Sequence, residues 1–264
     1  MLNEKSTYII LKKAIRENSF EYVYQPIYDL KQSKFTKLEV LLRLYNKKFG
    51  YISPTDFIPV AEKFGLIDKI GLKVFTQACK TASLFKNLGV EFDDISVNIS
   101  AIQFKDKLLY NNLVTILQKY KIKPNKITLE ITETSSISSI LDLEKTATKL
   151  SNYGFNIALD DFGSGYNSFS KLLNIPFTYI KIDKDIINSL ENNENARVIL
   201  KHILDFSNEI NLQVIAEGIE SKESLDILEM YNCRYIQGFY FSKPLKFEEI
   251  YKVLTKQKAT TILS

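Results

Sequence analysis

Two adjacent aspartates, Asp160 and Asp161, directly follow an apolar run at 155–159 that is typical of a short buried strand. They lead into a loop that contains Gly163. Because neighbouring carboxylates repel each other and are costly to remove from water, this position indicates a bound cation or a shared proton. Two structural alternatives stay open, since such a pair can also cap a helix or precede glycine in a turn.

Most other predicted strands also end in an oxygen-bearing or charged side chain. Each of these has an ordinary explanation when taken alone, such as a surface lysine, a capping asparagine or a loop glutamate. A barrel would bring all of them to one mouth, where barrel enzymes carry their chemistry, so together they predict a metal-centred active site. The residues are Glu39 and Arg43, Asn98, Glu130 and Glu133, Lys181 and Asp183, Glu217 and Glu220, and Gln237.

The residue types restrict the chemistry of that site. The single histidine, His202, falls in the helical pattern 194–210, which excludes a histidine-based triad or a histidine-rich zinc site. A metal would therefore have oxygen ligands, which favours Mg²⁺ or Mn²⁺. Carboxylates with a carboxamide suit two hard cations about 3.5–4 Å apart, bridged by one aspartate. With a lysine beside the bridging water and Arg43 binding a phosphate oxygen, the residues predict a metal-dependent phosphodiesterase or phosphatase of unspecified substrate.

Short apolar strands alternate with amphipathic helical segments along most of the chain. This alternation predicts an α/β fold, a (β/α)8 TIM-like barrel, with an open doubly wound sheet as the alternative. Functional groups spread over many strand ends favour the barrel, because an open sheet gathers them at one switch point. The predicted strands are 20–28, 35–44, 94–99, 126–131, 155–160, 178–182, 212–216 and 234–238. The predicted helices include 55–64, 68–87, 107–120, 137–153, 194–210 and 221–230.

Composition is that of a soluble globular enzyme. The 264 residues are 45% hydrophobic and 25% charged, with a net charge of +4. This charge tolerates an anionic ligand, but no basic stripe indicates a DNA or RNA polymer as partner. Cys79 and Cys233 lie far apart and form no metal-binding pair, which is consistent with reduced thiols and a cytoplasmic location. We expect no signal peptide and no membrane span.

The candidate residues, taken in order, resemble the EAL domain family, the bacterial cyclic di-GMP phosphodiesterases of second-messenger signalling. The resemblance runs from about Phe20 to Pro244 and rests on the order and spacing of short motifs. These are Tyr24-Gln25-Pro26, Glu39-Val40-Leu41-Leu42-Arg43, Phe57-Ile58-Pro59-Val60-Ala61-Glu62, Val97-Asn98-Ile99-Ser100, Leu129-Glu130-Ile131-Thr132-Glu133, Asp160-Asp161-Phe162-Gly163, Lys181-Ile182-Asp183, Ala216-Glu217-Gly218-Ile219-Glu220 and Gln237-Gly238.

The resemblance implies a barrel with one antiparallel strand and hydrolysis of cyclic di-GMP to linear pGpG. It also implies two Mg²⁺ or Mn²⁺ ions, with Ca²⁺ expected to be inhibitory. By position, the metal ligands would be Glu39, Asn98, Glu130, Asp160, Asp161 and Glu217, with Asp160 bridging the ions. Lys181 and Glu217 would be the catalytic pair that positions and activates the water.

The remaining matched positions imply supporting roles. Gln237 would orient solvent at the metals, and Glu133 would brace the loop 162–168. The substrate-binding positions would be Gln25, Leu41, Arg43, Asp183 and Glu220, although Asp183 and Glu220 match only as acidic residues near the site.

The chain departs from the family pattern at few positions. Val40 replaces alanine in the signature triplet, which we expect to tune affinity and to leave the chemistry intact. In the loop, Ser164 replaces threonine and Asn167 replaces serine, and both keep hydrogen-bonding capacity. No expected ligand is missing.

Two other functions are compatible with the same residues. The domain can be a catalytically silent cyclic di-GMP receptor or protein-interaction module, because fold alone never establishes activity. It can also be a metal phosphodiesterase with another substrate. We further expect an N-terminal helix in 1–19 that packs on the barrel, the barrel itself in 20–256, a tail at 257–264, and possible pairing into homodimers.

Overall fold

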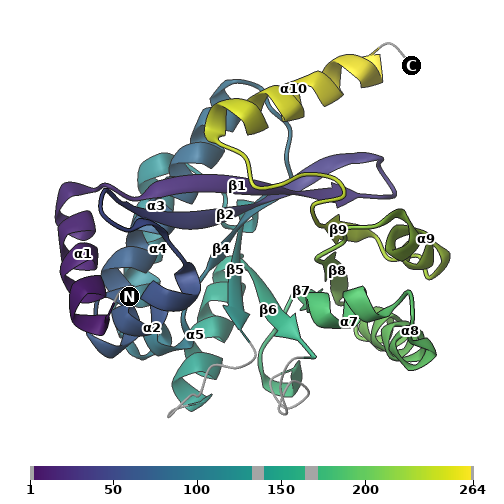
Figure 1. Ribbon diagram of the computed structural model, residues 1–264, viewed down its shortest axis with the longest axis horizontal. Helices are drawn as coiled ribbons and strands as arrows, with labels where there is room; N and C mark the ends of the chain where they lie inside the picture. Colours follow the sequence, from purple (N-terminus) through teal and green to yellow (C-terminus); the bar gives the residue numbers. More distant parts are fainter. Residues whose placement is uncertain (1–2, 133–139, 164–171, 263–264) are drawn as a thin grey trace.

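The computed structural model describes residues 3–132, 140–163 and 172–262. Helices surround a central ring of strands (Figure 1). The strands are β1 Glu21–Asp29, β2 Lys34–Asn46, β3 Gly50–Ile52, β4 Asp94–Asn98, β5 Ile127–Thr132, β6 Asn156–Phe162, β7 Tyr179–Ile182, β8 Gln213–Glu217 and β9 Tyr235–Gln237. The helices are α1 Glu4–Glu17, α2 Pro54–Lys63, α3 Ile67–Asn87, α4 Leu109–Tyr120, α5 Ile140–Tyr153, α7 Lys184–Ser189, α8 Glu194–Glu209, α9 Lys222–Met230 and α10 Phe247–Ile262.

Eight of the strands close into a barrel. The order is β1-β9-β8-β7-β6-β5-β4-β2, and β1 also pairs with β2, which joins the two ends. Strand β1 is antiparallel to both of its neighbours, whereas the remaining barrel pairs, from β2 through β4 to β9, are parallel. Strand β3 extends β2 as a hairpin outside the ring. The expected barrel with one antiparallel strand is therefore confirmed.

The parallel strands are apolar because both of their faces are covered. Residues 127–131 of β5 are all buried, as the chain packs helices outside the ring and side chains inside it. On the outer side, α3 turns the apolar stripe of Ile70, Val74, Ala78 and Phe85 inward, and all four side chains are buried. The stripe predicted from its spacing is a core face.

A buried polar network fills the barrel interior away from the strand ends that carry the candidate site. Lys37 Nζ lies 2.5 Å from the Asp94 carboxylate and donates to the Tyr179 hydroxyl at 2.7 Å. Thr128 donates to the other Asp94 oxygen, and Lys37 also lies over the ring of Tyr235. Because both charges are paired and hydrogen-bonded, they can lie inside the protein.

The predicted elements agree with the observed ones to within a few residues at each end. Strand β3 and helices α7 and α10 were not among the predicted elements. Helix α10 packs on the barrel through Ile250 and Leu254, which are buried, and through the Gln257 side chain, which accepts the Phe35 N–H at 2.6 Å. Residues 257–262 of the predicted tail are thus the last part of this helix.

Helix α1 does form within the predicted segment 1–19, with Leu11 and Ala14 buried. Among the described residues, no helix combines the length and the apolar character that crossing a membrane requires.

Candidate active site at the carboxyl ends of the strands

The strand-end residues predicted from the sequence converge at one mouth of the barrel. Alternate side chains of a strand point to the same face, so one inward position near the carboxyl end of each strand can face the barrel axis. In the long strand β2 this position is Glu39, within the segment 37–40 that pairs with β4. These positions are Glu39 on β2, Asn98 on β4, Glu130 on β5, Asp160 on β6, Lys181 on β7, Glu217 on β8 and Gln237 on β9.

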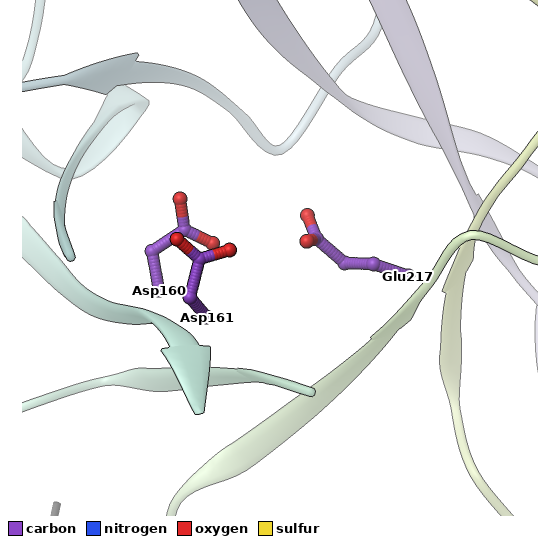
Figure 2. Close-up of side chains that lie close together, drawn as sticks. All are labelled: Asp160, Asp161 and Glu217. Carbon is purple, nitrogen blue, oxygen red and sulfur yellow. The ribbon is translucent and has the colours of Figure 1, made fainter. Parts of the chain in front are cut away.

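The adjacent aspartates break the alternation of their strand. The pairing of β6 with β7 is irregular between Leu159 and Phe162, and Asp161 has a φ of 55°. A bulge of this kind adds a residue and re-aims side chains, which is why both carboxylates can face the mouth. Figure 2 shows Asp160 and Asp161 side by side, with Glu217 reaching toward them from the opposite side.

The ammonium group of Lys181 lies at the centre of the acidic side chains. Its Nζ is 2.8 Å from Glu130 and 2.7 Å from Glu217. Asp160 and Glu39 follow at 3.3 Å and 3.4 Å. Lys181 is almost completely buried, so one positive charge faces four carboxylates where bulk water screens them little.

Two side-chain amides orient Glu39 within this cluster. Asn98 donates to one oxygen of Glu39 and Gln237 donates to the other, each at 2.7 Å. Because each amide uses its NH₂ group here, its carbonyl oxygen is left as an acceptor or metal ligand. The orientation of the Asn98 and Gln237 amides therefore suits a site that binds cations.

The electrostatics are unbalanced in favour of negative charge. Burial, followed by the neighbouring carboxylates, raises the pKa of Glu217 to about 8 even though Lys181 opposes the shift. Burial and then Asp160 raise the pKa of Asp161 to about 6. Burial also raises the pKa of Glu130, again against Lys181. One lysine does not offset this many buried acids, so cations or protons must bind with them.

The donor set fits a divalent cation. Asp160, Asp161 and Glu217 can offer carboxylate oxygens that lie within 4.8 Å of one another. Within the described part of the chain, the buried oxygens Glu130 Oε1 and Asp160 Oδ1 accept no hydrogen bond, although Lys181 lies 3.3 Å from the latter. Buried carboxylate oxygens without such partners, in a site without histidine, match the ligands of Mg²⁺ or Mn²⁺.

A pocket of about 340 Å³ opens above the acidic cluster. Gln25 and Glu220, two of the predicted substrate-binding residues, line it together with Glu39, Asp160, Lys181, Glu217 and Gln237. Two further lining residues were not predicted, namely Lys184 and Phe239. Each immediately follows a matched motif, which is the signal that could have identified them.

A second, mainly apolar pocket of about 290 Å³ shares Asn98 with the site. Leu41 and Arg43 line it, and the Arg43 Nη1 donates to the Leu42 carbonyl at 3.0 Å. Glu62 and Ser100 join them there, linked by a 2.6 Å hydrogen bond from the serine. Four of the five predicted substrate-binding residues therefore line one or the other of these two pockets.

Three predicted site residues among those described line neither pocket: Glu130 and Asp161, which belong to the acidic cluster, and Asp183. Asp183 caps α7, accepting the Asp185 N–H at 2.7 Å, and its predicted contact with substrate stays a prediction. Glu133 and residues 164–168 of the loop lie outside the described residues.

Comparison with protein families gives one match across most of the chain. The family model described as "EAL domain" matches residues 10–244. Among curated proteins, the oxygen sensor protein DosP of Escherichia coli (strain K12) is 34% identical over 240 residues, which is 91% of this chain and 30% of DosP. The probable cyclic di-GMP phosphodiesterase PdeG of the same organism is 31% identical, over 96% of this chain and 50% of PdeG.

The chain thus spans half or less of the length of these curated relatives. Among solved structures, the PaMucR phosphodiesterase in complex with c-di-GMP has a TM-score of 0.86 at 31% identity. That match covers 92% of this chain and 99% of the other. The fold and the arrangement of strands therefore agree with those of a solved homologous domain.

Proposed function

The chain belongs to the EAL domain family, and on that premise we propose that it is a metal-dependent phosphodiesterase that hydrolyses cyclic di-GMP to linear pGpG. The observation that carries the proposal is the ring of Glu39, Glu130, Asp160 and Glu217 around Lys181. Titratable groups with perturbed pKa values in a pocket mark functional sites. Support also comes from the relatives whose names describe cyclic di-GMP phosphodiesterases.

Two divalent cations, Mg²⁺ or Mn²⁺, would bind among the acidic side chains. Glu39, Asn98, Glu130 and Asp160 would hold one ion, and Asp160, Asp161 and Glu217 the other. When bound, such ions supply Lewis-acid activation of water and neutralise charge that develops on the phosphate. The buried carboxylate oxygens that accept no hydrogen bond and the shortage of positive charge in the cluster support this assignment.

The protein's own residues then position the reactants. Lys181 donates to Glu130 at 2.8 Å, and its Nζ lies 2.7 Å from the Glu217 carboxylate. Lys181 and Glu217 can therefore hold and orient a water at the mouth. Glu217 is half-buried at the mouth, and its carboxylate, once ionised, can accept a proton from that water. Gln237 fixes the orientation of Glu39 and can hydrogen-bond the same solvent.

The reaction breaks one phosphodiester linkage of the cyclic dinucleotide. The water oxygen forms a bond to phosphorus, the bond from phosphorus to the 3′ oxygen breaks, and the leaving oxygen takes up a proton. The product pGpG then carries one phosphomonoester at its 5′ end. Gln25 and Glu220 would contact substrate in the mouth pocket, and Leu41 and Arg43 in the adjoining apolar pocket, where Arg43 can bind a phosphate oxygen.

A side-by-side hydrolysis assay tests the substrate. The purified protein is incubated with cyclic di-GMP, pGpG and an aryl phosphodiester, in the presence of Mg²⁺ or Mn²⁺, and the products are separated by chromatography. We expect rapid conversion of cyclic di-GMP to pGpG and much slower turnover of the other two. Equal turnover of the aryl phosphodiester would indicate a different substrate, and tight nucleotide binding without product would indicate a receptor.

A further inference from the structure

A groove remote from the barrel mouth combines apolar walls with positive charge. It lies between α1 and the start of α3 and encloses about 520 Å³. Tyr8, Ile9, Ile15 and Leu66 provide its apolar part, and the charged residues that line it are Lys12, Lys13, Arg16 and Lys69. Among the residues the structure describes, no acidic side chain lines this groove.

The groove carries more positive charge than the nearby carboxylates neutralise. Glu17 lies 3.1 Å from Arg16 and 4.0 Å from Lys13, which neutralises part of it. Over the described ranges, no carboxylate lies within ion-pair distance of Lys12 or Lys69. Helices α1 and α3 together carry eight basic and three acidic residues, a net charge of +5 against +4 for the whole chain. The two helices therefore carry a net positive charge, whereas the rest of the chain sums to a net charge of −1.

Exposed apolar and aromatic side chains adjoin this charge. Ile9 is 59% exposed and Phe64 is 43% exposed. The Tyr8 and Phe64 rings lie 4.8 Å apart, and Lys12 and Lys63 lie over them. Large aromatic side chains next to cations are typical of residues that anchor protein interfaces, since they contribute area and hydrogen-bonding or cation–π contacts together.

The groove also contacts the element that shapes a substrate pocket. Leu66 and Lys69 line the groove at the start of α3, whereas Ile67 and Ile70, on the other face of the same turn, line the apolar pocket that contains Arg43. Figure 1 shows α1 beside α2, at the edge of the molecule opposite α7, α8 and α9. An occupant of the groove would therefore contact the back of the pocket wall without blocking the mouth.

From this combination we infer that the α1–α3 groove is a docking surface for a partner protein that presents an acidic amphipathic helix. A concave groove with apolar walls fits the apolar face of a helix, and the lysines at its rim fit acidic residues on the flanks of that helix. Charge complementarity of this kind gives selectivity and fast association. The inference concerns binding alone and does not depend on the proposed phosphodiesterase activity.

The test uses a designed helical peptide of about 18 residues, roughly five turns, with leucine on one face and glutamate on the other. Its binding to the full chain is followed by fluorescence anisotropy at low and high salt. We expect binding that weakens with salt, and that falls about tenfold or more in the double variant Lys12→Glu/Lys69→Glu. A scrambled peptide of the same composition, which has no apolar face, should bind at least about tenfold more weakly.

A matched control variant is Lys107→Glu/Lys252→Glu, which changes the net charge equally at exposed lysines outside the groove. It should bind the peptide like the unmodified protein. Equal loss in both variants, or equal binding of the scrambled peptide, would show non-specific attraction and overturn the inference. Lysine-dependent binding to vesicles with anionic lipids, without peptide binding, would identify a membrane surface instead. Concentration-dependent sedimentation that is lost in the groove variant, again without peptide binding, would identify a second copy of the chain.

Discussion

At the scale of single residues, the site is built on an imbalance of charge that the protein maintains inside its barrel. Lys181 pairs with four carboxylates but cannot neutralise all of them, so burial raises the pKa values of Glu130, Asp160 and Glu217. The pKa of Glu39 moves the other way: burial would raise it, but Lys181 and two amide hydrogen bonds lower it. The cluster is thereby prepared to exchange protons for cations.

Asp160 should be indispensable to turnover. The change Asp160→Asn removes the one charge that both proposed ions share, while it keeps the size of the side chain. We expect turnover of cyclic di-GMP to fall by about a thousandfold or more, measured as initial rates of pGpG formation. Asp205→Asn, at an exposed helical position, is the control and should keep its activity. Near-normal turnover in the Asp160 variant would contradict the two-metal assignment.

The site residues were predictable from the sequence where each ends an apolar strand. Glu130 and Glu217 follow runs whose burial is apparent from their composition, and a barrel then leaves little freedom in where they point. Lys184, Phe239 and the capping role of Asp183 were not predictable in this way. Their positions depend on the conformations of the loops that follow the strands, which the apolar pattern does not encode.

At the scale of elements, two features of the strands support the site: an irregular pairing and a buried ion pair. The irregular β6–β7 pairing, with Asp161 in the left-handed region, points adjacent carboxylates to one side. Deeper in the barrel, the Lys37–Asp94 pair supports the interior with hydrogen bonds to Tyr179 and Thr128. The hydrogen-bonded network around this pair joins strands that are distant in sequence, namely β2, β4, β5 and β7.

Replacing one member of the Lys37–Asp94 pair should destabilise the protein more than replacing both members together. Lys37→Met leaves the Asp94 charge buried and unpaired, so we expect a loss of about 3–5 kcal/mol in the free energy of unfolding. Asp94→Leu should have a similar cost, for the converse reason. The double variant should recover much of the loss, because no unpaired charge remains. Urea denaturation measures all three, and additive losses in the double variant would contradict the pairing.

Gly238 should tolerate no side chain. A Cβ atom there would lie 2.1 Å and 2.4 Å from the backbone oxygen and nitrogen of Ile219, in the loop that follows Glu217. Gly238→Ala should therefore displace this loop, which should lower both the stability and the turnover.

Gly50→Ala is the matched control for Gly238→Ala. It has a positive φ of 71° but no atom within 4 Å of the added Cβ, so it should cost only about 1 kcal/mol and leave turnover unchanged. Thermal denaturation and initial rates distinguish the two variants. Equal effects of the two would contradict the contact with Ile219 as the cause of the loss.

The elements themselves were largely predictable because periodicity and turn residues mark their limits. Helix α10 was not predictable from periodicity alone. Phe247, Ile250 and Leu254 have helical spacing, but the apolar stripe is short. Its burial depends on packing against β1 and Phe85, which the local sequence does not reveal. The hairpin at β3 was missed because three residues are too few for a period to appear.

At the scale of the whole molecule, closure of the barrel makes the site a property of the complete fold. The proposed ligands come from β2, β4, β5, β6 and β8, and the antiparallel strand β1 joins the ring by pairing with β2 and β9. Binding at the mouth therefore links strands from both halves of the chain. A ligand that binds only the folded state stabilises all of it.

Divalent cations should stabilise the protein in a pH-dependent way. In the cation-free protein the pKa of Glu217 is raised from 4.5 to about 8, so its contribution to stability is complete below pH 4.5 and is lost as the pH rises through 8. Cations bind the ionised form, which reverses this loss. We expect saturating Mg²⁺ to raise the Tm by roughly 5 °C or more at pH 8.5 and by little at pH 5.5. Differential scanning fluorimetry measures the shift, and one that is independent of pH would contradict the assignment.

Metal-dependent turnover tests the central proposal most directly. The protein is stripped of metal with a chelator, reconstituted with Mg²⁺, Mn²⁺ or Ca²⁺, and supplied with cyclic di-GMP, and pGpG is followed by chromatography. We predict product with Mg²⁺ or Mn²⁺ and little with Ca²⁺, which binds carboxylates with longer and looser coordination. Product formed at the same rate without any divalent cation, or tight binding of cyclic di-GMP without product under every condition, would contradict the proposal.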